Sequence, residues 1–192
     1  MSDPIDVITL VGSLRRESTS RRLALALASV APRELSLEVA DIGQLPLYNQ
    51  DLEASAPQPW RAFRQRVRRA RAVLFVTPEY NRSVPAALKN AIDVGSRPYG
   101  ESVWSGKPAA IVSCSPGAIG GFGANHHLRQ SLVFLNMPTL QQEAYIGGVD
   151  KLVTEHGDFA QPATREFCAR LMAGFAEWIR RVSPSRPGSD GS

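Results

Sequence analysis

Residues 7–21, VITLVGSLRRESTSR, join an apolar, β-branched run to a loop of hydroxyls and arginines. The run predicts a strand that ends at Gly12, and residues 22–31, RLALALASVA, predict a helix. Strand, polar loop and helix is the order with which α/β proteins bind phosphate, because loop N–H groups and the positive helix end converge on the anion. The plainer alternative is a solvated loop between a strand and a helix.

The loop lacks two common nucleotide-binding motifs. It contains neither GxxxxGK[ST], the phosphate loop of NTPases, nor GxGxxG, the dinucleotide fingerprint. What remains is a pocket lined by Ser and Thr with arginines at both ends. Such a pocket suits one terminal phosphomonoester, the group that FMN carries.

Length and composition favour one domain over residues 1–182. The chain has 192 residues, 43% hydrophobic and 21% charged, which is ordinary for a globular protein. No run is long enough to span a membrane and the N-terminus lacks a signal-peptide pattern, so a cytoplasmic location is expected. Residues 183–192, SPSRPGSDGS, have the composition of a disordered tail.

Cysteine and histidine usage does not favour a metal site. Cys114 and Cys168 have no metal-type spacing, and we expect both to be small buried residues. The adjacent His126 and His127 would point about 100° apart on a helix and cannot share one metal, which leaves only His156.

The positive charge is concentrated in one segment. The net charge is +4 and the pI about 9.4, and six arginines lie between residues 61 and 71. Trp60, Phe63, Val67 and Ala70 recur there at helical spacing, which predicts an amphipathic helix with the arginines on its solvated faces. Nucleic-acid binding is the weaker interpretation, because no aromatic-studded patch accompanies the charge.

Predicted strands alternate with predicted helices along the chain. The strands are Ile5–Val11, Leu35–Ala40, Ala72–Thr77, Ala109–Cys114 and Pro138–Ile146. Beyond the two helices already described, further helices are predicted at Ala86–Val94, about Asn125–Leu135 and Thr164–Val182. This pattern predicts an α/β, doubly wound sheet of five parallel strands with helices on both faces. In such a fold ligands bind at the carboxyl ends of the strands, where the strand order reverses.

The loops after the third and fourth strands suit a flat aromatic ring. Pro78 and Pro85 stiffen the first of them, PEYNRSVP, and the second, SPGAIGG, allows close approach of the backbone to a ligand. The alternatives are a tight turn and a mobile surface loop. These two loops and the polar loop after the first strand all follow the carboxyl ends of parallel strands, namely strands one, three and four. We therefore expect all three loops to open on one edge of the sheet.

Four motifs, GSLRxxS, TPEYNxSVPxxLKNAID, GAIGG and HLRQSLVFLNMP, resemble those of the NADPH-dependent FMN reductases, in particular the bacterial quinone and chromate reductase branch. The resemblance implies a flavodoxin-like fold, non-covalent FMN and assembly as dimers or pairs of dimers. It also implies transfer of two electrons from NADPH or NADH to quinones, free flavins, azo compounds or metal oxyanions such as chromate.

The same resemblance implies which residues contact the cofactor. The first loop would hold the phosphate through Ser13, Arg15, Ser18, Thr19, Ser20 and Arg21. The ring and ribityl chain would be bordered by Pro78, Glu79, Tyr80 and Asn81, and the pyrimidine end of the flavin by Ser115 and Gly117. Thr19-Ser20 departs from the Phe-Asn of many relatives, and Arg82 replaces an often aromatic residue at the mouth of the expected substrate site. Residues 122–126 also depart from the arginine- and tyrosine-containing sequence of close relatives. The resemblance implies that this stretch affects tetramer contacts and substrate preference.

No catalytic side chain is expected, because a flavin performs the hydride chemistry while the protein orients it. Two other functional classes remain open at this point. One is a flavodoxin-type electron carrier without NAD(P)H turnover, although the basic pI argues against it. The other is a nucleic-acid-binding protein that uses the arginine-rich helix.

Overall fold

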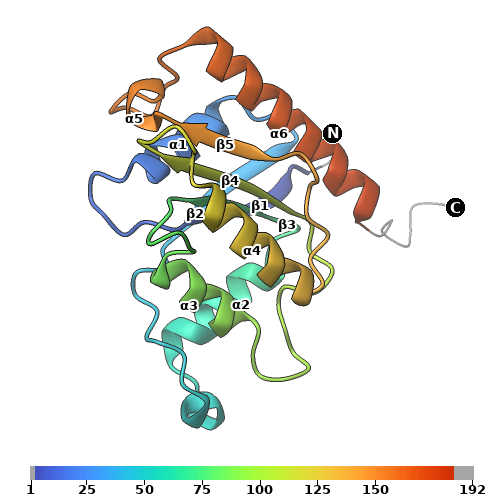
Figure 1. Cartoon of the computed structure of the whole chain (residues 1–192). Helices are drawn as coiled ribbons and strands as arrows, with labels where there is room; N and C mark the ends of the chain where they lie inside the picture. Colours follow the sequence, from blue (N-terminus) through green and yellow to red (C-terminus); the bar gives the residue numbers. More distant parts are fainter. Residues whose placement is uncertain (1–2, 184–192) are drawn as a thin grey trace, which may run out of the picture.

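The computed structural model describes residues 3–183, which form a five-stranded parallel sheet (Figure 1). The strand order is β2-β1-β3-β4-β5, so the predicted flavodoxin-like sheet is confirmed. The strands are β1 (Ile5–Val11), β2 (Leu35–Ala40), β3 (Ala72–Thr77), β4 (Ala109–Ser115) and β5 (Ala144–Gly147). All four pairings are parallel, which directs the carboxyl ends of the strands to one edge.

Helices cover both faces of the sheet (Figure 1). One face carries α1 (Thr19–Ser29), the short α5 (Val149–Leu152) and α6 (Pro162–Val182). The other carries α2 (Gln58–Arg69), α3 (Ala86–Gly95) and α4 (Phe122–Phe134). A short 3-10 helix, η1 (Gln50–Ser55), precedes α2.

The central strand β3 is buried throughout because both of its faces are covered. Leu74 and Val76 pack into the core beneath α1 and α6, whereas Val73 and Phe75 pack beneath α2, α3 and α4. In the edge strand β2, the exposed Ser36 and Glu38 instead alternate with the less exposed Leu35, Leu37 and Val39. The continuous apolar run of β3 thus lies at the centre of the sheet and the alternating run of β2 lies at its edge, as their sequences predicted.

Several element boundaries differ from the predictions. Helix α1 begins at Thr19, three residues before the expected start, because the Ser18 hydroxyl accepts the Arg21 N–H at 3.1 Å and caps it. Helix α4 begins at Phe122, ahead of the expected Asn125, after left-handed glycines turn the chain. Helix α6 begins two residues early, at Pro162.

The fifth strand is shorter than predicted. It spans only Ala144–Gly147, and Thr139 makes an isolated bridge to Ala109 ahead of it. Most of the predicted tail, residues 184–192, lies outside the described residues.

The arginine-rich helix was predicted correctly, but its arginines are not uniformly solvated. Arg64 is only 7% exposed, so the prediction of a solvated face is wrong at this residue. Arg66 bonds to Asp6 of β1 and Glu38 of β2, each at 2.8 Å, and joins α2 to two strands.

Within residues 3–183, no helix is long and apolar enough to cross a membrane. The same part of the chain holds no group of three His, Cys, Asp or Glu side chains arranged to bind a metal ion.

Candidate functional site

The loops after β1, β3 and β4 open on the same edge of the sheet (Figure 1). These strands are neighbours, and the connection from β1 passes outward to β2 before the chain returns to β3. The strand order therefore reverses between β1 and β3, which is where ligands bind in open α/β sheets. The predicted meeting of the three loops is confirmed by this topology.

A cavity of about 310 Å³ lies beside the first loop. Its lining includes Ser13, Arg15 and Arg21, three of the predicted phosphate residues, together with residues 40–44 that follow β2. Asp41 also lines the cavity, but its carboxylate accepts the Gly43 N–H at 2.9 Å. Two guanidinium groups beside the N-terminus of α1 give this cavity the chemistry of a phosphate site.

The remaining residues of that loop have other surroundings. Ser18 is buried as the cap of α1, and neither it nor Thr19 nor Ser20 lines the cavity. The Ser20 hydroxyl is fully buried without a hydrogen-bond partner in the described part of the chain, beside the Cys114 thiol. Burial raises the pKa of Cys114 to about 11, so this thiol is unreactive near neutral pH, as expected.

The β3–α3 loop forms a tight turn. The Tyr80 N–H donates to the Ser83 carbonyl at 3.1 Å, and the Ser83 N–H returns to the Tyr80 carbonyl at 2.9 Å. Asn81 and Arg82 have φ values of 49° and 63°, the pattern of a type I′ turn. Asn tolerates this left-handed region, but Arg does not favour it, so the turn stores strain of about 1–3 kcal/mol at such a position.

Glu79 faces helix α4. Its side chain is 12% exposed, and its Oε2 accepts the Ala124 N–H at 3.0 Å. The N-cap of α4 is Gly121, which offers no side chain, so Glu79 supplies the missing cap from another loop. Glu79 was expected to border the ring, and its carboxylate also joins two walls of the site through this hydrogen bond.

Gly123 makes that contact possible. A Cβ at this position would lie 2.7 Å from the Arg82 carbonyl oxygen and 2.9 Å from Glu79 Oε2. A second link joins the same elements, since Ser83 Oγ lies 3.0 Å from His127 Nδ1. The turn at residues 80–83 is therefore attached to α4 on two sides, and Tyr80 and the Arg82 side chain remain exposed.

The glycine-rich loop after β4 is packed closely onto β5. A Cβ at Gly120 would lie 2.7 Å from the Tyr145 backbone, and both Gly120 and Gly121 have positive φ. The Ser115 hydroxyl donates to the Gly117 carbonyl at 2.9 Å and closes the start of the loop. Gly117 is exposed, so its backbone is open to a flat ligand at this edge.

Sequence reasoning missed two positioning residues in this region. Asn90 accepts the Tyr48 N–H at 2.8 Å and donates to the Leu45 and Pro46 carbonyls, which fixes the long loop before α2. Its signal was a polar residue on the buried side of the helix, among Leu88, Ala91 and Ile92. His126 lies 2.9 Å from the Tyr145 hydroxyl, whose pKa is raised to about 12 by burial and by Glu143.

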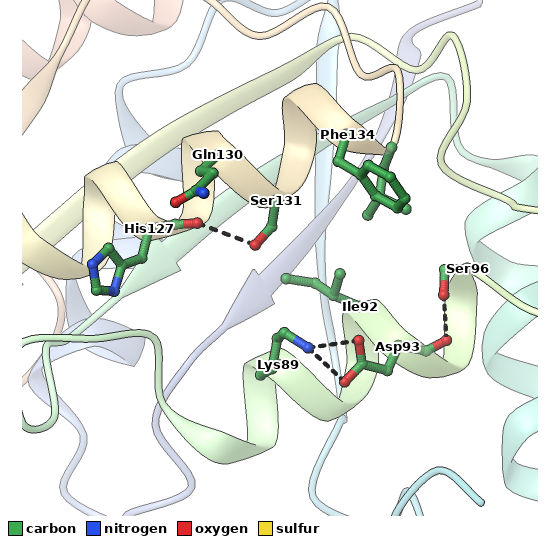
Figure 2. A pocket seen from close by; sticks show the side chains of 9 residues that line it. Lys89, Ile92, Asp93, Ser96, His127, Gln130, Ser131 and Phe134 are labelled. Atoms are coloured by element: carbon green, nitrogen blue, oxygen red, sulfur yellow. Dashed lines mark hydrogen bonds and ion pairs between the residues drawn. The ribbon is translucent and has the colours of Figure 1, made fainter. Parts of the chain in front are cut away.

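A larger groove, of about 580 Å³, lies between α3 and α4, and its His127 end adjoins the turn at residues 80–83 (Figure 2). Lys89 and Ile92 of α3 face His127 and Phe134 of α4 across it. The Lys89 ammonium is paired with Asp93 at 2.8 Å, and Phe134 is 87% exposed. We call this surface the α3–α4 groove.

The loop edge has the features that FMN requires. The cavity beside Arg15 and Arg21 can take its phosphate, and the Tyr80 turn and the Gly117 loop offer exposed backbone to its ring. When bound, FMN supplies two-electron hydride chemistry.

Comparison with known proteins gives the same result. The model of the NADPH-dependent FMN reductase family matches residues 5–151. A quinone reductase from Pseudomonas putida is 58% identical over 94% of this chain and 97% of its own length. A 2-hydroxy-1,4-benzoquinone reductase from a Burkholderia species is 45% identical over 92% and 97%. FerB, a flavoenzyme NAD(P)H:(acceptor) oxidoreductase from Paracoccus denitrificans, superposes with a TM-score of 0.88 at 38% identity, covering 92% of this chain and 98% of FerB. The chain therefore belongs to the NADPH-dependent FMN reductase family, as an oxidoreductase with FMN as cofactor and NAD(P)H as electron donor.

Proposed function

We propose that this enzyme reduces quinones with electrons from NAD(P)H, and that free flavins, azo compounds and metal oxyanions such as chromate are further acceptors. The observation that carries the proposal is that two features lie at the edge where the strand order reverses between β1 and β3. One is the cavity lined by Arg15 and Arg21, and the other is the strained turn at residues 80–83. The naming of two similar proteins as quinone and benzoquinone reductases supports the same acceptor class. The buried free thiols Cys114 and Cys168 suit a reducing, cytoplasmic setting.

In this proposal the residues of the chain bind and orient, and none acts as a strong acid or base. Arg15, Arg21 and Ser13 hold the phosphate beside the N-terminus of α1. Pro78, Glu79, Tyr80, Asn81, Ser115 and Gly117 border the ring. The Glu79 carboxylate also fixes the turn that carries Tyr80 and Asn81. Ser18, Thr19 and Ser20 contribute their backbone N–H groups at the start of α1, because the hydroxyls of Ser18 and Ser20 are buried.

The phosphate site is tested by Arg15→Ala. A guanidinium on a phosphate dianion contributes about 1.5–3 kcal/mol, so FMN affinity should fall about tenfold to more than a hundredfold. Arg16→Ala is the matched control, because Arg16 is exposed in the same loop but does not line the cavity. Fluorescence titration with FMN and riboflavin measures both effects. Riboflavin affinity should not change, and equal losses in the two variants would assign the effect to general charge.

Arg82 is proposed to attract the electron donor. Its side chain is 74% exposed at the mouth of the site, and NADPH is anionic whereas quinones are neutral. Donor and acceptor would use this opening in turn, which gives ping-pong kinetics with parallel double-reciprocal lines. A flavodoxin-type carrier would show no such turnover.

The test uses Arg82→Asn, because Asn tolerates the left-handed backbone at this position; the substitution removes the charge together with the exposed ion pair to Glu79 Oε1 at 3.4 Å. At low salt, kcat/KM for NADPH should fall about two- to fivefold while kcat/KM for a quinone stays constant, and added salt should remove the difference. Arg69→Asn, on the exposed end of α2, is the charge control. If only kcat/KM for the quinone fell, Arg82 would instead be assigned to binding of the acceptor.

We also propose that the α3–α4 groove joins two copies of the chain, as a homodimer or as the basic pair of a homotetramer. The exposed apolar side chains Tyr99, Val133 and Phe134 lie at or beside this groove, with exposed fractions of 92%, 72% and 87%. Such a cluster on a soluble surface marks an interface. A second copy of the same helices offers matching apolar surface.

Phe134→Lys tests the dimer. Because Phe134 is largely exposed in a single chain, the fold should persist while the molar mass in analytical ultracentrifugation falls to that of a monomer. Leu25→Lys, at a half-exposed position of α1 on the opposite face, should leave the mass unchanged. An unaltered oligomer in Phe134→Lys would place the interface elsewhere.

A further inference from the structure

A second arginine-lined cavity lies beside α2, between the segment that precedes this helix and the residues that follow α3. Its volume is about 400 Å³, and its lining includes Arg61, Arg64 and Arg68, which occupy successive turns on one face of the helix. Residues 53–56 before α2 and Pro98 and Glu101 after α3 complete the wall. Three guanidinium groups thus border one hollow that contains two carboxylates, those of Glu53 and Glu101.

Arg64 is the unusual member of this set. It is 7% exposed, its Nε donates to the Val94 carbonyl at 2.9 Å, and its guanidinium lies 5.8 Å from the centre of the Trp60 ring. Its Nη2 is buried and has no hydrogen-bond partner within residues 3–183. Burial lowers the pKa of Arg64, but a guanidinium remains charged in proteins. The fold therefore holds a buried cation with unused hydrogen-bonding capacity.

The nearby carboxylates do not pair with Arg64. Glu101 lies 3.3 Å from Arg68 in a pair whose two side chains are both more than half exposed, and such a pair is easily exchanged. Glu53 accepts the Tyr48 hydroxyl at 2.6 Å. In the described part of the chain, no carboxylate lies within ion-pair distance of Arg64.

The position of this cavity separates it from the cofactor loops. Arg64 contacts Val94 in the last turn of α3, whereas the tight turn at residues 80–83 leads into the first turn of that helix. The cavity and the phosphate cavity beside Arg15 share no lining residue. An anion bound here would accordingly leave the FMN phosphate site free.

We propose that this cavity binds a phosphate group, as inorganic phosphate or on a small organic molecule, at a site distinct from the cofactor site. The planar guanidinium forks of Arg64 and Arg68 match phosphate oxygens, and the anion places a negative charge beside the Arg64 guanidinium, which lines the cavity and has no ion-pair partner in the described part of the chain. The cavity is within the size range of small-molecule sites, so it has room for an organic group on the phosphate. Glu101 competes with the ligand for Arg68.

The test is calorimetric titration of inorganic phosphate into FMN-loaded protein from which excess FMN has been removed, at constant ionic strength. One saturable site is expected. Arg68→Gln, at a half-exposed position that tolerates substitution, should weaken it about tenfold. Glu101→Gln should tighten binding about threefold, because it frees Arg68 and removes a negative charge. Arg64→Met should abolish binding while keeping the contact with Trp60.

Arg69→Gln is the matched control, since Arg69 is exposed on the same helix and does not line the cavity. It should bind phosphate as the unmodified chain does. A parallel titration with phenyl phosphate distinguishes the two kinds of ligand. If phenyl phosphate binds more tightly than inorganic phosphate, the site takes an organic phosphate; if the two bind equally, the site takes the inorganic ion. Absence of a saturable site, or equal losses in Arg68→Gln and Arg69→Gln, would overturn the proposal. The assay measures binding alone, so its result is independent of quinone reduction.

Discussion

The hydrogen bond from the Ala124 N–H to Glu79 Oε2 holds the site together, because it joins two loops that the sheet alone only brings near each other. Parallel strands place the β3–α3 and β4–α4 loops at one edge, but backbone pairing ends at Thr77 and Ser115. Beyond those residues the Glu79 carboxylate carries the connection together with the contact between Ser83 and His127. The carboxylate caps α4, which has no capping side chain of its own, and it braces a turn with two left-handed residues.

This bond also explains small residues around it. Gly123 must lack a Cβ because the Arg82 carbonyl and Glu79 occupy that space, and Gly121 must turn the chain into α4 with a positive φ. The close approach of Gly120 to the Tyr145 backbone fixes the same loop against β5. Strain at Asn81 and Arg82 is thus balanced by contacts with α4, as is common where a loop must present a fixed surface to a ligand.

The sequence predicted the sheet, its central and edge strands and the meeting of three loops, because apolar periodicity reports burial directly. It did not predict where single polar side chains point. The motif PEYN suggested that Glu79 borders a ring, but nothing in the sequence indicated that its carboxylate also caps α4 across the loop. The sequence predicted Arg64 to be one of six charges on a solvated helix. In the structure its guanidinium lies over the Trp60 ring and its Nε donates to the Val94 carbonyl. Such contacts depend on elements that meet only in three dimensions.

The dissociation constant of FMN in Glu79→Gln and Glu79→Ala tests the central claim most directly, because the two variants remove the same charge but only Gln keeps an oxygen for the Ala124 N–H. If Glu79 acts by bracing the turn, Glu79→Ala should weaken FMN binding about tenfold or more, as expected from loss of a cap and release of the loop, whereas Glu79→Gln should stay close to the unmodified enzyme. Equal affinities in all three proteins, or equal losses in the two variants, would contradict the account.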